Sequence, residues 1–356
     1  MNGRRRGLGL IAIPLGIILF FAAFPVIWFN EGRVDLSVLA EDSIPLSGDA
    51  FSAENEGKLV AVSGEIQSDE LLGDAPYLNP QPFIHLKRSV EMYAWDQTGS
   101  EEDGYSYKKV WTSSPEDSDQ FDQPSGHQNP PMALQADSFS ASSANIGRYE
   151  VIPSQIIFGQ VEEIVLAEGD VTGGRLSENQ LYIGSASPES PQIGDMRIQY
   201  AAYQANQFTT VFGKQENGQV VTWRGEDDTL IYRGYALDRE GGIAALKTEY
   251  LTALWGVRMG ALAMFFAGLM MSLSPLRRIL GYVPILGNVG NMAIAGIAFV
   301  VSLIVWIITL TIAIILHNLI ALIVVLLLVG AAGYFFWSRR KGGDALDEEL
   351  DLTVKA

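Results

Sequence analysis

The chain has 356 residues, with 41 acidic and 24 basic side chains, a formal net charge of -17 and no cysteine. Without cysteine it has no disulfide bond, no thiolate nucleophile and no cysteine-based metal site. The acidity is concentrated between residues 31 and 250, where 36 acidic side chains stand against 14 basic ones. This stretch is expected to repel nucleic acid and other polyphosphates.

Four long apolar segments surround the acidic stretch. The first, 22 residues without a charge, is about 33 Å long as a helix and covers the hydrocarbon core of a bilayer. We therefore predict an α+β membrane protein with four transmembrane helices, and a large β-rich extracytoplasmic domain inserted between helices 1 and 2. The predicted segments are a basic N-terminus (1–7), helix 1 (8–29), the domain (30–250), helix 2 (251–273), a connector (274–291), helix 3 (292–316), helix 4 (319–337) and an acidic tail (338–356).

A cleaved signal peptide is the alternative for the first segment, because basic residues precede it and Ala22-Ala23 resembles a cleavage site. The apolar core of a signal peptide is only ~7 to 15 residues long. Here the apolar run continues to Phe29 and ends in aromatic residues, as at a membrane interface. An uncleaved anchor is predicted.

Basic clusters set the expected orientation, because short loops rich in lysine and arginine stay in the cytoplasm. With four alternating helices, all three clusters fall on one side: Arg4 to Arg6, Arg277-Arg278 and Arg339 to Lys341. Both termini are predicted to be cytoplasmic and the large domain extracytoplasmic. No Asn-x-Ser/Thr sequence occurs, which favours a bacterial inner membrane; in a eukaryote the endoplasmic reticulum or nuclear envelope is expected.

The acidic domain has the alternating apolar pattern of strands. Residues 58–66 and 89–95 alternate, and residues 105–111 read as the hairpin partner of the second strand. Tyr93, Trp95 and Trp111 are then expected to pair across the hairpin as core residues rather than as a ligand platform. Further strands are predicted at 150–152, 196–203, 208–213, 219–224 and 229–235, helices at 154–167 and 237–250, and a long loop at 113–143.

Residues able to carry chemistry are few. The three histidines, at positions 85, 127 and 317, have no metal-ligand spacing, and no Walker, G-x-S-x-G or H-E-x-x-H motif is present. His127 is predicted to cap a turn. We expect no catalysis, no cofactor and no metal; an enzyme that uses the 113–143 loop is the weakest alternative.

Arg258 is the single charge inside the predicted spans. It lies about 10 Å into the second helix, deep enough to need a partner and shallow enough to snorkel. It is expected to pair with Glu31, to cap backbone carbonyls or simply to snorkel. Around it, Gly256 and Gly260 form a G-x-x-x-G, which serves packing within the molecule, with residues 330–333 as a mate, or dimerisation. The connector is predicted to lie along the interface as a short amphipathic helix.

Seven short motifs in order resemble the LUMA, or transmembrane protein 43, family. They are Asn30-Glu31-Gly32-Arg33; Glu54 to Gly57; Arg88 to Tyr93 with Trp95; Tyr105 to Tyr107 with Trp111; Gly126 to Pro130; Ile193 to Asp195 with Arg197; and Trp255 to Arg258. The resemblance covers residues 20 to 338. It implies a four-span protein that acts by interaction and self-association, whose animal members are tied to the nuclear membrane, emerin and lamins. The acidic tail and short N-terminus of this chain argue against transferring those partners.

The functional prediction is a multi-pass membrane scaffold that self-associates and organises or senses the membrane or envelope. Its expected partners are the lipid bilayer, further copies of itself and other envelope proteins of unknown identity, and not nucleic acid. The alternative is a cation channel or channel regulator formed by oligomerised spans. Sparse polar residues on the third span, Ser302, Thr309 and Thr311, weaken that alternative.

Overall fold

The computed structural model describes residues 7–50, 53–100, 104–226, 228–275, 286–318, 322–331 and 334. The basic clusters, most of the 274–291 connector, both ends of the predicted fourth span and the acidic tail lie outside these residues. The chain divides into two compact units. Asp35–Tyr250 forms one unit, and Met1–Val34 with Leu251–Ala356 forms the other.

The helical unit contains α1 (Gly7–Glu31), the C-terminal part of α3 (Arg239–Ser272) and α5 (Leu286–His317). In the described residues, three helical stretches are long and apolar enough to cross a membrane: Ala12–Glu41, Arg239–Ser272 and Met292–His317. A shorter apolar helix, Leu322–Ala331, lies within the predicted fourth span. α3 starts 12 residues before the predicted second span, consistent with the helix predicted for 237–250. α5 begins at Leu286, within the predicted connector.

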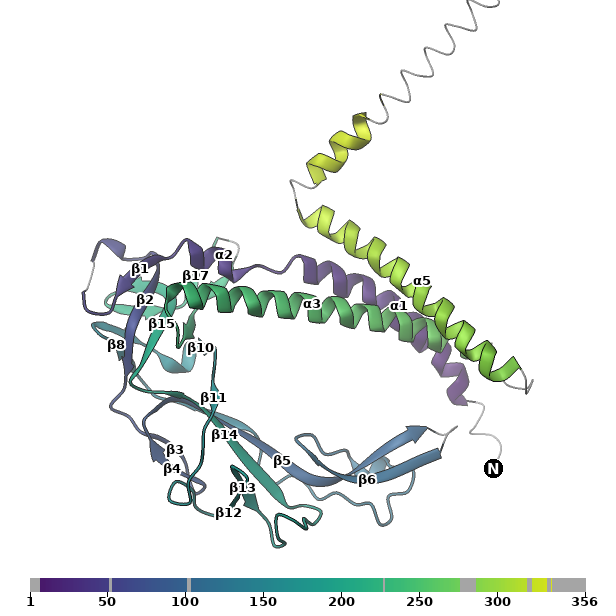
Figure 1. Ribbon diagram of the computed structural model, residues 1–356, viewed down its shortest axis with the longest axis horizontal. Helices are drawn as coiled ribbons and strands as arrows, with labels where there is room; N and C mark the ends of the chain where they lie inside the picture. Colours follow the sequence, from purple (N-terminus) through teal and green to yellow (C-terminus); the bar gives the residue numbers. More distant parts are fainter. Residues whose placement is uncertain are drawn as a thin grey trace, which may run out of the picture. The chain divides into compact units, whose positions relative to one another are not determined.

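The three long helices lie side by side (Figure 1). Small residues and aromatic rings fill the contacts between them. Phe265 of α3 meets Phe20 and Phe24 of α1 at ring-centroid distances of 5.1 and 5.0 Å. One turn before Phe20 in α1, the backbones of α1 and α3 come into contact. A Cβ added at Gly16 would lie 2.7 Å from the carbonyl oxygen of Gly268. Only glycine at both positions permits this close crossing.

The other unit is built on two large sheets. The first has the strand order β1-β2-β8-β9-β16-β15-β19-β10, and β2 also pairs with β15. That extra pairing joins five strands, β2, β8, β9, β16 and β15, into a closed ring around a core with Val62, Tyr149 and Val211. The strands are β1 (Ile44–Ser47), β2 (Leu59–Gln67), β8 (Ala144–Ile146), β9 (Tyr149–Val151), β16 (Gln219–Val221), β15 (Gln207–Glu216), β19 (Arg233–Tyr235) and β10 (Ile157–Phe158).

The second large sheet has the order β12-β13-β14-β5-β6, with β11 added to β14 and β7 to β5. Its strands are β12 (Arg175–Ser177), β13 (Gln180–Ile183), β14 (Met196–Gln204), β5 (Phe83–Ser100), β6 (Gly104–Thr112), β11 (Glu162–Glu163) and β7 (Asp137–Ser140). β5 is 18 residues long and forms with β6 the long hairpin predicted from the sequence (Figure 1). Val90, Met92 and Ala94 point from β5 into the second core.

Small elements complete this unit. They are the pair β3 (Leu72–Asp74) and β4 (Leu78–Gln81), the pair β17 (Trp223–Arg224) and β18 (Leu230–Ile231), and the short helix α2 (Leu36–Glu41). Arg239, in the first turn of α3, donates hydrogen bonds to the carbonyl oxygens of Ala40, Glu41 and Ser43 at 3.2, 2.6 and 3.0 Å. It thereby holds the beginning and the end of the unit together.

The helix predicted at residues 154–167 is wrong. Pro153–Gln155 forms a single 3-10 turn, after which β10 pairs with β19 and β11 with β14. Burial alternates there, with Ile156 and Phe158 buried and Ile157 exposed, which is the period of a strand. The predicted strands 219–224 and 229–235 each divide into two pieces that join different sheets. The α+β class and the remaining strands are confirmed.

Candidate functional site

The strongest polar contact within the helical unit joins α1 to α3. Arg258 Nε lies 2.9 Å from Oε1 of Glu31, and Arg258 Nη2 lies 2.7 Å from Oε2, so the pair is bidentate. The two side chains are 11% and 5% exposed, respectively. Both carboxylate oxygens are engaged by the guanidinium, an arrangement that fixes orientation as well as charge.

Local sequence places the two groups opposite each other. Glu31 is the last residue of α1, and Arg258 lies on the same face of α3 as the buried residues Leu254 and Ala261. One turn before the arginine, the Trp255 ring lies 4.7 Å from the guanidinium carbon. A cation over an indole face adds roughly 0.5 to 2 kcal/mol, more as water is excluded.

Two further hydrogen bonds extend the ion pair into a polar cluster across three helices. Asn30 Nδ2 donates to the Leu254 carbonyl at 3.1 Å, again joining α1 to α3. Trp306 Nε1 donates to the Arg258 carbonyl at 2.8 Å and so attaches α5. In the described part of the chain, the buried Oδ1 of Asn30 has no hydrogen-bond donor. These residues form what we call the interhelical lock: Asn30, Glu31, Trp255, Arg258 and Trp306.

The chemistry of the interhelical lock is structural. Removing one member of a buried ion pair leaves an uncompensated charge and costs about 3 to 5 kcal/mol. Of the three arrangements considered for Arg258, the structure has the ion pair. Arg33 takes no part: it is exposed, and its backbone N–H donates to the Asn30 carbonyl at 3.2 Å.

The two glycines beside Arg258 lie on a different face of α3. Gly256 and Gly260 are exposed, and a Cβ added at either would meet nothing within 4 Å among the described residues. The same holds for Gly330, on the helix considered as their mate. The described residues therefore do not pack against this G-x-x-x-G face, whereas Gly268 is filled by α1.

The predicted aromatic residues meet on the β5–β6 hairpin, in the other unit. Tyr93 is in register with Trp111, and their ring centroids are 5.2 Å apart. Trp95 is in register with Lys109, whose Nζ lies 5.0 Å from the indole centroid. These side chains are half-buried rather than in the core.

His127 belongs to the same aromatic group through the loop that follows β6. Its ring stacks on Tyr107 at 3.8 Å and meets Trp95 edge-on at 4.7 Å. Its Nδ1 lies 3.0 Å from the Gln123 carbonyl oxygen, consistent with the turn-capping role. Asn129 fixes the loop further, because its side chain accepts from the Trp95 N–H and donates to the Trp95 carbonyl, at 2.7 and 2.9 Å. The loop is therefore fastened onto the hairpin.

Sequence reasoning missed a buried network in the second sheet. Arg88 Nη1 donates to both carboxylate oxygens of Asp74 at 2.6 and 2.8 Å, and the Tyr200 hydroxyl donates to Asp74 at 2.6 Å. Burial, followed by the hydrogen bond to this carboxylate, raises the pKa of Tyr200. Arg88 also donates to the Gln135 carbonyl, which holds the long loop. No spacing rule joins three residues so far apart in the chain; the signal is the charge of Arg88 at a position that alternates with the apolar residues Leu86 and Val90.

Comparison with known proteins identifies the family. The sequence model of the family described as transmembrane protein 43 matches residues 88–319, which include Arg258 and Trp306. The chain belongs to the transmembrane protein 43 family. Within the described residues, no group of three or more histidine, aspartate or glutamate side chains is placed to hold a metal ion.

Curated members of the transmembrane protein 43 family are similar over most of their length. Transmembrane protein 43 of Rattus norvegicus is 28% identical over 326 residues, covering 81% of this chain and 80% of the relative. That of Homo sapiens is 28% identical over 322 residues, with the same coverage, and the Drosophila melanogaster homolog is 26% identical over 328 residues, covering 82% and 87%. No solved structure matches.

Proposed function

We propose that this member of the transmembrane protein 43 family is a multi-pass membrane scaffold that self-associates and organises or senses the membrane through protein contacts, without catalysis. In this proposal α1, α3 and α5 cross the bilayer, and residues 319–337 form a fourth span. The Asp35–Tyr250 unit lies outside the cytoplasm, with both termini inside. The basic clusters at Arg4, Arg277 and Arg339 support this orientation.

The observation that carries the proposal is the contrast between two faces of α3. One face is filled by α1 and fastened by the interhelical lock. The other presents Gly256 and Gly260, and no described residue lies within 4 Å of a Cβ added at either. Small residues spaced four apart let a second helix approach closely in a membrane. A second copy of the chain is the expected neighbour.

Cross-linking of the full chain in detergent and in vesicles tests the proposal. Gly256→Leu with Gly260→Leu is expected to remove the dimeric species. Gly296→Leu is the matched control, because Gly296 also lies exposed in an apolar helix and no residue that the structure describes is within 4 Å of its added Cβ. A wild-type chain that stays monomeric at every concentration would refute the scaffold. Equal dimer yield in both variants would refute this face as the contact.

The channel alternative has less support. The hydroxyls of Ser302, Thr309 and Thr311 donate to carbonyls of their own helix, at 2.7, 2.8 and 2.7 Å. These are also the only hydroxyl-bearing side chains in residues 292–316, which is few for the lining of a cation pathway. Cation flux into vesicles that contain the wild-type chain, absent from protein-free vesicles, would reverse this preference.

A further inference from the structure

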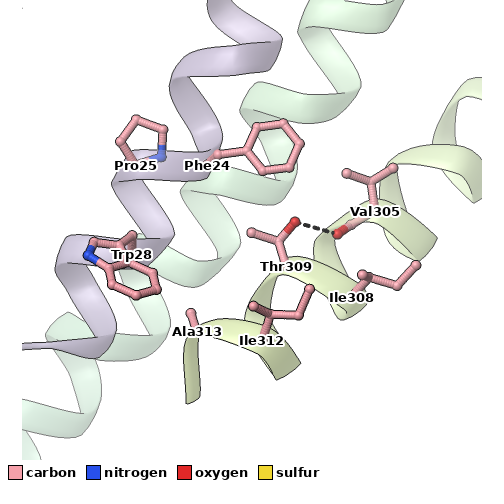
Figure 2. Close-up of a pocket in the computed structure, with 8 residues that line it drawn as sticks. All are labelled: Phe24, Pro25, Trp28, Val305, Ile308, Thr309, Ile312 and Ala313. Atoms are coloured by element: carbon pink, nitrogen blue, oxygen red, sulfur yellow. Dashed lines mark hydrogen bonds between the residues drawn. The ribbon is translucent and has the colours of Figure 1, made fainter. Parts of the chain in front are cut away.

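A groove with a volume of about 390 Å³ lies between α1 and α5. Figure 2 shows it bounded by α1 on one side and by α5 on the other. The lining residues are Phe24, Pro25 and Trp28 of α1, and Val305, Ile308, Thr309, Ile312 and Ala313 of α5. All belong to stretches apolar enough to cross a membrane.

The lining selects a hydrocarbon occupant. Its side chains are aliphatic or aromatic except for Thr309, whose hydroxyl donates to the Val305 carbonyl at 2.8 Å (Figure 2). A polar ligand would lose its hydration without gaining partners here, which costs several kcal/mol for an unpaired group. A saturated or unsaturated hydrocarbon has no polar group and therefore loses no hydrogen bonds to water on entering the groove.

The dimensions of the groove suit a single hydrocarbon chain. Val305 to Ala313 spans about 12 Å along α5, so a volume of about 390 Å³ corresponds to a mean cross-section of roughly 30 Å². Packed carbon atoms lie about 3.5 to 4.0 Å apart, so one extended chain fits. A helix about 10 Å across does not enter the groove, but a helix can lie over it with side chains in the groove, so coverage by the Leu322–Ala331 helix is one outcome that the test distinguishes.

One end of the groove has the character of a membrane interface. Trp28 lies near the C-terminal end of α1, and its ring is 4.4 Å from that of His317, the last residue of α5. Tryptophan is enriched where hydrocarbon meets headgroups. A chain that enters past this ring pair runs down the groove towards Val305.

We propose that the groove binds one acyl chain of a membrane phospholipid, with the headgroup at the Trp28–His317 end. The inference rests on the proposed membrane insertion of α1 and α5. The bound chain contacts both helices, so a change in lipid chains alters the α1–α5 contact. This gives the sensing part of the proposed function a physical route.

The test counts phospholipid that stays with the purified full chain. The protein is reconstituted in palmitoyl-oleoyl phosphatidylcholine, extracted in mild detergent and measured by native mass spectrometry. Ile308→Trp fills the groove, and Ile307→Trp is the matched control, since the two isoleucines are 53% and 48% exposed and only Ile308 lines the groove. We expect one retained lipid in the wild type and in Ile307→Trp. Ile308→Trp should retain roughly tenfold less, a difference of about 1.4 kcal/mol in binding free energy.

A second variant, Thr309→Phe, guards against misfolding of the first, and circular dichroism confirms the helix content of each. Equal retention in Ile308→Trp and Ile307→Trp, or no retained lipid in a wild type that resists carbonate extraction from membranes, overturns the inference. So does an efficient disulfide between Ile308→Cys and Leu326→Cys, which would place the later helix over the groove; the chain has no native cysteine to interfere. Release of the wild type by carbonate would instead show that the proposed insertion fails.

Discussion

Breaking the Glu31–Arg258 pair tests the central claim about the helical unit. At 2.7 Å between nitrogen and oxygen, the attraction is about 6 kcal/mol with an effective dielectric constant of 20. Removing both charges from water costs a comparable amount, so the intact pair adds little net stability. A single change, Glu31→Gln or Arg258→Met, leaves one buried charge unpaired and should cost about 3 to 5 kcal/mol. The double variant should cost much less than the sum.

The assay is chemical unfolding in detergent followed by circular dichroism, with a double-mutant cycle over the four proteins. Neutralising the exposed pair Arg224–Asp228 serves as control, because its side chains are 66% and 83% exposed at 3.1 Å. Its coupling energy should stay below about 0.5 kcal/mol. If the single variants at positions 31 and 258 each cost less than about 1 kcal/mol, or if their costs simply add, the interhelical lock does not hold the helices as described.

Three further perturbations follow from the packing. Gly16→Leu should separate α1 from α3 and destabilise the full chain by at least about 2 kcal/mol in thermal melts in detergent. Gly296→Leu should not, because a Cβ added at Gly296 meets nothing within 4 Å among the described residues. Equal losses in the two variants would contradict the close crossing. Arg88→Leu should cost about 3 to 5 kcal/mol because the Asp74 carboxylate stays buried, and a loss under about 1 kcal/mol in urea unfolding would exclude the network. Burial raises the pKa of Tyr232 to about 12. The contribution of Tyr232 to the free energy of unfolding is therefore complete below pH ~10 and declines as the pH rises through 12. Tyr232→Phe should make the free energy of unfolding fall less steeply over this pH range, and an unchanged pH profile would contradict the raised pKa.

The strands were predictable from burial period and residue type. β14 alternates buried and half-buried residues from Met196 to Ala202, and that period specifies a half-buried strand. β2 is buried at three successive positions, Val60 to Val62, and its β-branched residues favour a strand. The helix predicted for residues 154–167 was wrong because the apolar pattern there is ambiguous. Their short apolar runs fit both a helix and a strand, and only the sheet edges at β14 and β19 decide the outcome.

The candidate site was predictable where a charged side chain lies within an apolar segment. Arg258 within an apolar helix requires a partner, and Glu31 is the nearest acid at the same depth. Asn30 and Trp306 gave no such signal, because a neutral polar residue near a span end is common. Their partners are 224 and 48 residues away in the chain, so only the assembled bundle reveals them.

The two sheets differ in how they face other molecules. Ring closure through β2 and β15 leaves little open backbone in the first sheet, but β6 ends the second, and no described strand pairs with its outer side. An open edge of nine residues invites strands from neighbouring copies to add on. Lys108 and Lys109, in the middle of this edge, lie against side chains of β5: Lys108 Nζ is 3.3 Å from an Asp96 oxygen, and Lys109 Nζ is 5.0 Å from the centre of the Trp95 ring. Lysine side chains on an edge strand are one of the devices that discourage edge-to-edge pairing between copies of a protein.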